Sequence, residues 1–289
     1  MSINFSFGFY KKGIPGSVSG VWSVGANMNV AGSGLSGAGT QNAALKWGGR
    51  ISGSEEYDGT AWTTGGSFAF GNITRTGGAG TQNAGLAFGG YISTFPGGGT
   101  TAATSEYDGS TWSTGGNLIN VNDTNGGAGT QNAALNIAGN FNKNGSEEYN
   151  GTTWSTGGNM VSSVENASGV GAGSQDAALS TAGSGDGSYR NTQEYGGDSW
   201  SGGGAVITQR VAMGSAGTQN NAIMFGGGGG PSGTTNLSST QAYNGTTWFT
   251  GGNMITARRA LGAAGNANQA LAFGGFSTVD VATTEEFNS

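Results

Sequence analysis

Aromatic positions recur along the chain at a regular spacing, each next to a short polar turn. Tryptophans that follow such a turn lie 40 to 50 residues apart, at Trp22, Trp62, Trp112, Trp154, Trp200 and Trp248. Each of the last five follows a tyrosine by five positions, at Tyr57, Tyr107, Tyr149, Tyr195 and Tyr243. A fixed period of this length is typical of repeat architectures, so the chain is predicted to be a repeat protein.

A second recurring block lies between each tryptophan and the next aromatic residue. It reads Gly-Ala-Gly-Thr-Gln-Asn-Ala-Ala-Leu at 37–45 and at 127–135, and an apolar run then ends at a small pair such as Gly89-Gly90. Each unit thus contains four short segments, and pairs such as Asp108-Gly109 join the last two. Asp-Gly between alternating segments is a strong hairpin signal. Four antiparallel strands in 40 to 50 residues predict one blade of a β-propeller.

These residues resemble a known family. A glycine pair, a tyrosine and then a tryptophan form the pattern of kelch repeats, whose units are propeller blades, and the resemblance covers residues 20–289. The Ala138-Gly139 and Ala182-Gly183 pairs depart from it. The resemblance implies an all-β fold, a six-bladed kelch-like β-propeller. The isolated segment around Trp22 is expected to pair with the last one, around Phe287, so that an N-terminal strand joins the C-terminal blade and closes the ring.

The first 19 residues do not belong to the repeat. Ile3, Phe5, Phe7 and Phe9 alternate with polar or small residues, the pattern of a strand with one apolar face. We expect residues 1–19 to be a docking arm that adds to a sheet of another subunit or protein. The alternative is that this arm packs on the rim of the same chain.

Composition narrows the chemistry that the scaffold can carry. Glycine accounts for 62 of the 289 residues, against a usual share of about 7%; the first strands are expected to crowd the central axis, where only small residues fit. The net charge of −6 disfavours a nucleic-acid-binding surface. Histidine and cysteine are absent, which excludes Ser-His-Asp and Cys-His catalysis, thiolate or imidazole metal sites and disulfides. No cofactor, metal or membrane insertion is expected.

Residues that recur in most units are assigned to the scaffold. A glutamate precedes the aromatic residue in five units, at Glu56, Glu106, Glu148, Glu194 and Glu286. An acidic pair such as Glu147-Glu148 would also suit a glycosidase, and the tryptophans would suit sugar stacking. Recurrence favours hydrogen bonding and packing within the scaffold instead.

Residues peculiar to single units are the candidates for binding. The connections from second to third strand, and from fourth strand to the next unit, share one face and vary most; we call it the variable face. Binding residues are usually mounted on such loops. The candidates, which suit an anionic or saccharide ligand, are Arg75, Tyr91, Phe95, Phe141, Tyr189, Arg190, Arg210, Arg258 and Arg259. The alternative is that they are ordinary solubilising loop residues. Asp123, Asp186 and Asp280 lack the spacing of a calcium loop.

Two classes of function remain. Gly/Asn/Thr-rich kelch-like repeats with these blocks also resemble structural and tail-fibre-type proteins of marine tailed bacteriophages. That resemblance implies a non-enzymatic virion structural or adhesion protein, located in the virion. It would dock to other virion proteins or to further copies of itself through the arm, and present the variable face to a protein or host surface glycan.

The alternative is a polysaccharide-acting enzyme, sialidase- or lyase-like, on a propeller scaffold. The sialidase Asp-box has a spacer between Asp and Gly that the segment Asp58-Gly59-Thr60-Ala61-Trp62 lacks. Tyrosine, carboxylates and arginine are the available catalytic groups. An acidic pair facing an arginine cluster on the variable face would favour this alternative. An intracellular adaptor is disfavoured because no partner domain is attached.

Overall fold

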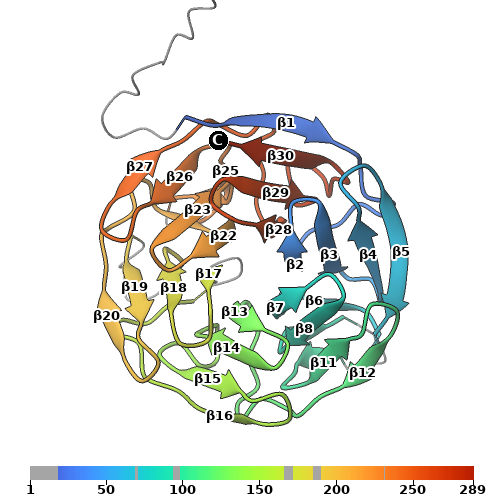
Figure 1. Cartoon of the computed structure of the whole chain (residues 1–289), viewed down its shortest axis with the longest axis vertical. Helices are drawn as coiled ribbons and strands as arrows, with labels where there is room; N and C mark the ends of the chain where they lie inside the picture. The colour runs from blue at the N-terminus through green and yellow to red at the C-terminus, as the bar shows by residue number, and fades with distance from the viewer. Residues whose placement is uncertain (1–18, 69–70, 94–97, 166–171, 185–189, 231) are drawn as a thin grey trace, which may run out of the picture.

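The computed structural model describes residues 19–68, 71–93, 98–165, 172–184, 190–230 and 232–289. Their strands form a ring of antiparallel sheets around a central axis, with the first strand of each sheet innermost (Figure 1). No helix occurs in these ranges, and so none is long and apolar enough to cross a membrane.

Six of the sheets have four strands, which follow one another from the axis outward. Sheet 1 contains β2 (Leu35–Thr40), β3 (Ala43–Gly48), β4 (Gly53–Tyr57) and β5 (Trp62–Ser67). Sheet 2 contains β7 (Gly77–Thr81), β8 (Ala84–Phe88), β11 (Thr104–Tyr107) and β12 (Trp112–Thr114). Sheet 3 contains β13 (Gly126–Thr130), β14 (Ala133–Ile137), β15 (Ser146–Tyr149) and β16 (Trp154–Thr156).

The ring continues with three further sheets. Sheet 4 contains β17 (Ala172–Gly173), β18 (Ala178–Thr181), β19 (Thr192–Tyr195) and β20 (Trp200–Gly202). Sheet 5 contains β22 (Gly214–Thr218), β23 (Asn221–Phe225), β26 (Thr240–Tyr243) and β27 (Trp248–Thr250). Sheet 6 contains β28 (Gly262–Gly265), β29 (Gln269–Phe273), β30 (Thr284–Asn288) and β1 (Val21–Gly25).

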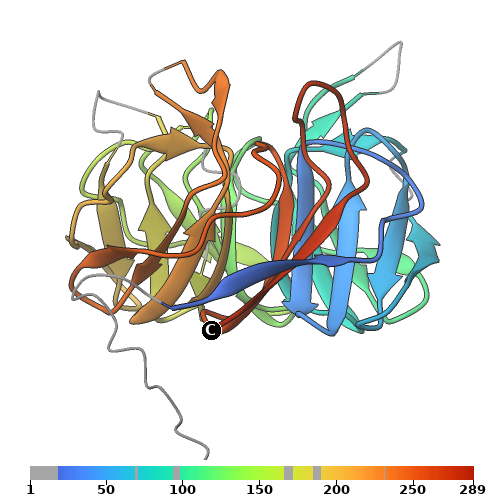
Figure 2. The same ribbon diagram turned by 90° about the horizontal axis from the view of Figure 1, so that it is seen from above.

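Two small sheets, which the sequence does not predict, are built from connections of the variable face. One contains β6 (Ile73–Thr74), β9 (Tyr91–Ile92) and β10 (Gly99–Thr100), and the other contains β21 (Arg210–Val211), β24 (Gly228–Gly229) and β25 (Thr235–Asn236). Seen from the side, the loops that carry them project from the same side of the ring (Figure 2). They give rigid backbone support to residues that would otherwise lie in free loops.

Closure of the ring involves both ends of the described chain. Strand β1 pairs antiparallel with β30, and Trp22 lies opposite Phe287. The N-terminal strand is thus the outer strand of the last sheet, as the sequence predicts. Because hydrogen bonds between distant segments complete this sheet, the ring has no free edge there.

Small residues of the first strands are required by close approach at the axis. A Cβ on Gly127 would lie 2.3 Å from the carbonyl oxygen of Gly78, and one on Gly37 would lie 2.8 Å from that of Ala263. Both distances are shorter than a methyl group and a backbone oxygen tolerate. The predicted crowding of the axis is therefore confirmed at these positions.

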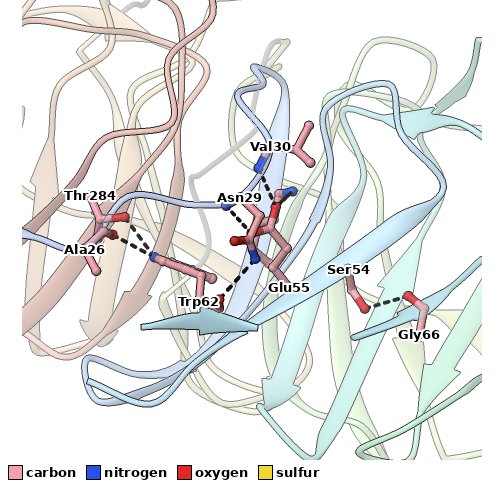
Figure 3. A network of polar contacts seen from close by, with 9 residues as sticks. Ala26, Asn29, Val30, Ser54, Glu55, Trp62, Gly66 and Thr284 are labelled. Carbon is pink, nitrogen blue, oxygen red and sulfur yellow. Dashed lines mark hydrogen bonds and ion pairs between the residues drawn. The ribbon is translucent and has the colours of Figure 1, made fainter. Parts of the chain in front are cut away.

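Neighbouring sheets are held together by the repeated aromatic residues. In each of the six repeated tryptophans, the Nε1–H donates to a hydroxyl of the preceding sheet, as from Trp62 to Thr284 and from Trp154 to Thr104, both 3.0 Å (Figure 3 shows the first). The Trp154 ring also packs edge-on against Phe88, with centroids 4.9 Å apart. Burial of large rings with their polar atoms satisfied is a strong stabilising contribution.

A second tie between sheets uses the repeated tyrosine and glutamate. The Tyr149 hydroxyl donates to Glu106 Oε1 at 2.5 Å. The same bond joins Tyr57 to Glu286, Tyr107 to Glu56, Tyr195 to Glu148 and Tyr243 to Glu194. Burial, and then the bond to the carboxylate, raise the pKa of each of these five tyrosines to about 12. The prediction that these glutamates belong to the scaffold is confirmed.

The contact between sheets 5 and 6 lacks this tie. Phe287 stands where the other sheets have tyrosine, and Ala242 stands where the preceding sheet would carry glutamate. Both side chains are buried. The chain therefore contains one apolar version of the pair beside five polar ones.

Buried carboxylates cap the connections between sheets. Glu55 accepts hydrogen bonds from the backbone N–H groups of Asn29 and Val30, and forms an ion pair with Lys46 at 2.8 Å (Figure 3). Glu147 and Glu285 accept the corresponding backbone bonds in sheets 3 and 6. Each of these buried acids thus accepts two backbone N–H groups of one connection and fixes that connection to its sheet.

Candidate functional site: an arginine-lined mouth

Five segments meet at the central axis on the variable face and form a rim. The rim residues directly precede the first strands or stand two positions before them, and all have positive φ: Gly34 (68°), Arg75 (60°), Thr124 (54°), Ala212 (51°) and Ala260 (53°). Their backbones are hydrogen-bonded in series. Arg75 N–H donates to the Gly34 carbonyl at 3.0 Å, and Thr124 N–H to the Arg75 carbonyl at 2.9 Å. The same bonds run from Gly34 to Ala260 and from Ala260 to Ala212. The rim is therefore a rigid frame.

A pocket of about 290 Å³ opens above this rim, and we call it the mouth pocket. Arg50, Arg75 and Arg259 all line it, together with rim residues and Ser232-Gly233 from the β24–β25 hairpin. No carboxylate lines it among the described residues. Three guanidinium groups around one pocket make a site for an anion.

Arg50 and Arg75 both occupy the left-handed region of the backbone, at φ of +68° and +60°. Such a conformation costs a residue other than glycine about 1–3 kcal/mol and is kept where the surroundings enforce it, often at functional sites. Here the backbone N–H of each is bonded, Arg50 to the Ile73 carbonyl and Arg75 to that of Gly34. Within the described part of the chain, the exposed Arg50 guanidinium has no hydrogen bond or ion pair. It is free to bind a ligand.

Arg259 is fixed from three sides. Its Nη1 donates to Asn236 Oδ1 at 2.8 Å and to the Thr234 carbonyl at 3.2 Å, and its guanidinium carbon lies 4.6 Å from the centre of the Phe276 ring. The contact with the ring adds a cation–π attraction. Arg259 is thus positioned before any ligand arrives, which lowers the entropy cost of binding.

Asp123 lies behind Arg75. Its Oδ2 is 3.7 Å from Arg75 Nη1, while its Oδ1 is buried and accepts no hydrogen bond. With 4% of its surface exposed, Asp123 orients Arg75 without lining the pocket itself. The acidic pair that would mark a hydrolase is absent from the described lining of the mouth, and no group of three or more Asp or Glu side chains suited to a metal lies elsewhere in the described ranges.

A second pocket of about 650 Å³ adjoins the first, and we call it the side pocket. Arg50, Thr74 and Arg75 line both pockets, and Asn72, Tyr91 and Ser93 complete this one. Tyr91 is 37% exposed and stands on β9, where its backbone pairs with Thr74 on one side and Thr100 on the other. The small sheet thereby fixes Tyr91 relative to both arginines.

Of the residues proposed from the sequence, the structure brings Arg75, Tyr91 and Arg259 together at the two pockets. Arg50 completes the site and was missed. It follows the pair Gly48-Gly49 as Tyr91 follows Gly89-Gly90, and this shared position in the repeat is the signal that would have found it.

The assignment of Arg210 and Arg258 to ligand binding is wrong. Both side chains are fully buried. Arg210 donates to the carbonyl oxygens of Gly226 and Ser239, and burial lowers its pKa to about 10. Arg258 donates to Thr283 and forms an ion pair with Glu285 at 3.2 Å. Both arginines tie loops to the scaffold, and neither reaches a ligand.

Two other candidates lie outside the pockets. Arg190 is exposed, and its Nε donates to the Val206 carbonyl at 2.7 Å. Phe141 is 64% exposed and does not line either pocket. Phe95, Tyr189 and the arm residues Ile3, Phe5, Phe7 and Phe9 lie outside the described residues.

Comparison with solved structures identifies the architecture. The structure of YjhT matches with a TM-score of 0.74 over 89% of this chain and 95% of that one, at 12% sequence identity. The chain is a β-propeller. No protein-family model and no curated protein matches its sequence.

The predicted function as a virion structural or adhesion protein is wrong. The structure of YjhT is among the solved structures that the chain matches, and no phage or kelch family model matches the sequence. The docking role of the arm, the partners and the location stay predictions.

Proposed function

We propose that the propeller acts on an acidic polysaccharide and that its mouth pocket holds the carboxylate of a uronic-acid unit. The observation that carries this proposal is the convergence of Arg50, Arg75 and Arg259 on one pocket in a chain with a net charge of −6. A guanidinium fork matches a carboxylate with two parallel hydrogen bonds. Because the net charge is negative, the protein as a whole does not attract polyanions, so selectivity for an acidic ligand has to come from the local positive charge of this pocket.

The groups that line the pockets favour a lyase over a hydrolase. Hydrolysis by the usual route needs two carboxylates that flank the glycosidic bond, and in the described parts of the chain no carboxylate lines either pocket. β-Elimination from a uronic acid needs neutralisation of the carboxylate and one group that moves a proton. The arginines supply the first, because their charge stabilises the carbanion-like transition state.

Tyr91 is the group that we assign to proton transfer. Besides the arginines, it is the titratable side chain that lines the side pocket, next to Arg50 and Arg75. In this step the Tyr91 oxygen is the base that takes the proton from C5 of the uronate. The C–H electron pair forms the C4=C5 double bond while the C4–O bond breaks, and the phenol returns its proton to the leaving oxygen.

We also infer that the six four-stranded sheets are the six blades of a kelch-type ring. Each contains the aromatic residue of its third strand, and each has a tryptophan at the start of its fourth, where Trp22 is the second residue of β1 in sheet 6. The two small sheets are then additions to blades 2 and 5, formed by their variable-face connections.

The proposal is tested by incubating the full chain with polygalacturonate, alginate, sulfated carrageenan and uncharged galactan, and following both new reducing ends and the absorbance of the C4=C5 double bond. We expect both signals with a carboxylated polymer. Tyr91→Phe should lower turnover by about 100-fold or more and leave binding within about twofold. Arg75→Ala and Arg259→Ala should weaken binding about tenfold or more, which corresponds to one lost charge-assisted hydrogen bond.

Arg190→Ala is the matched control, since Arg190 is an exposed arginine outside both pockets and should change nothing. Reducing ends without the double bond would contradict the lyase chemistry. Binding without any product would show that the protein is a binding protein and not an enzyme. Equal binding of all four polymers would show that the arginine pocket does not select the ligand.

A further inference from the structure

We infer that the ligand is a chain of at least two sugar units, with the acidic unit in the mouth pocket and its neighbour in the side pocket. This inference rests on the proposed function and adds a second subsite to it. Its basis is geometric: the two pockets share the wall formed by Arg50, Thr74 and Arg75, so a ligand held by these arginines has an open, adjoining space on the outer side.

The size of the side pocket gives room for a second sugar unit. A space of about 650 Å³ lies within the usual range of ligand sites, whereas the mouth pocket at about 290 Å³ is at its lower end. One monosaccharide would fill the mouth pocket and leave the larger space to water. A second unit in the side pocket would bury its surface against Thr74 and the Tyr91 ring.

The lining of the side pocket also suits the hydroxyl groups of a second sugar ring. Asn72 is exposed and offers an amide that both donates and accepts, and Ser93 offers a hydroxyl. Asn72 and Ser93 are held together by the backbone bond from Ser93 N–H to the Asn72 carbonyl, at 2.9 Å. The subsite is thus preformed, and its position is set by the same strand, β6, that precedes Arg75.

The direction in which the bound polymer runs follows from this arrangement. The N–H groups of Gly34, Arg75, Thr124 and Ala260 are used within the rim and so offer no hydrogen bond to a ligand that enters the axis. The side pocket, in contrast, offers polar side chains, so the polymer is placed to run outward, through the side pocket and over sheet 2. The bond next to the arginine-bound unit then lies beside Tyr91, where the proposed elimination takes place.

The experiment compares galacturonic acid, digalacturonic acid and trigalacturonic acid by isothermal titration calorimetry on the full chain with Tyr91→Phe, so that the ligands bind without being cleaved. The dimer should bind about tenfold more tightly than the monomer, since it fills a second subsite, and the trimer little more than the dimer. Asn72→Trp, which fills the side pocket, should reduce dimer affinity to that of the monomer and leave monomer affinity within about twofold. Asn72→Ala should cost the dimer about threefold or more.

Control substitutions separate the two proposals. Phe141→Trp places the same bulk at an exposed position outside both pockets and should leave both affinities unchanged. Equal affinities of monomer and dimer, or a dimer affinity that Asn72→Trp does not change, would overturn the second subsite while leaving the arginine site standing. Failure of all three acids to bind would overturn both proposals, and unchanged melting temperatures would show that the variants are folded.

Discussion

The tie between Tyr149 and Glu106 gives the sharpest quantitative prediction about the scaffold. Tyr149→Phe removes a hydroxyl that donates to Glu106 Oε1 at 2.5 Å and accepts from the Gly116 N–H at 3.4 Å. The tyrosine is fully buried, whereas Glu106 is half-buried. A hydrogen bond to a charged group contributes about 1.5–3 kcal/mol. Because water can still reach Glu106 after the change, we expect the lower end, about 1.5 kcal/mol.

The partner substitution should cost a similar amount, and the double variant should cost less than the sum. Glu106→Ala leaves the buried Tyr149 hydroxyl without its acceptor, at about 1–2 kcal/mol. Tyr149→Phe with Glu106→Ala reproduces the apolar pair Phe287 and Ala242 that the chain uses between sheets 5 and 6. With neither polar group left unsatisfied, the double variant should lose about 1.5–2 kcal/mol, a coupling of about 1 kcal/mol or more.

The assay is urea unfolding followed by tryptophan fluorescence, with the free energy of unfolding compared across wild type, the two single variants and the double variant. Tyr91→Phe is the control, because Tyr91 is exposed and belongs to no tie between sheets. Strict additivity of the two substitutions, or a Tyr149→Phe change within about 0.3 kcal/mol of wild type, would show that the bond does not hold the sheets together.

The buried tyrosines, Arg50 and Gly127 each give a further prediction. The pKa of about 12 for Tyr57, Tyr107, Tyr149, Tyr195 and Tyr243 lies above the usual value of 10, so the neutral form is favoured in the folded state. The stability that these five tyrosines contribute should be complete below pH 10 and be lost as the pH rises through 12. A melting temperature that stays constant between pH 10 and pH 12 would contradict this prediction. Arg50→Gly should raise the free energy of unfolding by about 1 kcal/mol, because Arg50 has φ of +68°, while it weakens the binding of digalacturonic acid. Calorimetry and urea unfolding measure the two effects, and a loss of stability would show that the backbone there is unstrained. Gly127→Ala should destabilise by about 2 kcal/mol or more, because its Cβ would lie 2.3 Å from the Gly78 oxygen; Gly202→Ala, with nothing within 4 Å, is the control.

The repeated elements of the fold could be predicted because each is specified locally and then confirmed by its copies. A hairpin signal such as Asp108-Gly109 and a tryptophan such as Trp112 mark the outer strands of one sheet, and the same signs appear in the others. The role of Glu106 followed from recurrence alone. The pairing of β1 with β30 could be predicted because the repeat leaves the segment around Trp22 without a third strand before it and the segment around Phe287 without a fourth strand after it.

The candidate site was predicted only in part, because neighbouring residues at the rim point in different directions. Arg258 enters the scaffold while Arg259 faces the mouth, and nothing in that dipeptide separates them. Aligning the repeat units on the glycine that opens β7 and β28 does separate the two arginines. Arg258 then stands with Ile73, and Arg210 falls in the same position, and all three side chains are buried. The small sheets around β6 and β21 escaped prediction because two-residue strands carry no periodic signal.

The central claim is that an acidic sugar binds at the mouth of the propeller through three arginines. A crystal structure of the full chain with digalacturonic acid tests it most directly. We expect one carboxylate within hydrogen-bond distance of Arg50, Arg75 and Arg259, and the second sugar beside Tyr91 and Asn72. Density for the sugar on another part of the surface, with the mouth pocket holding only water at saturating ligand, would contradict it.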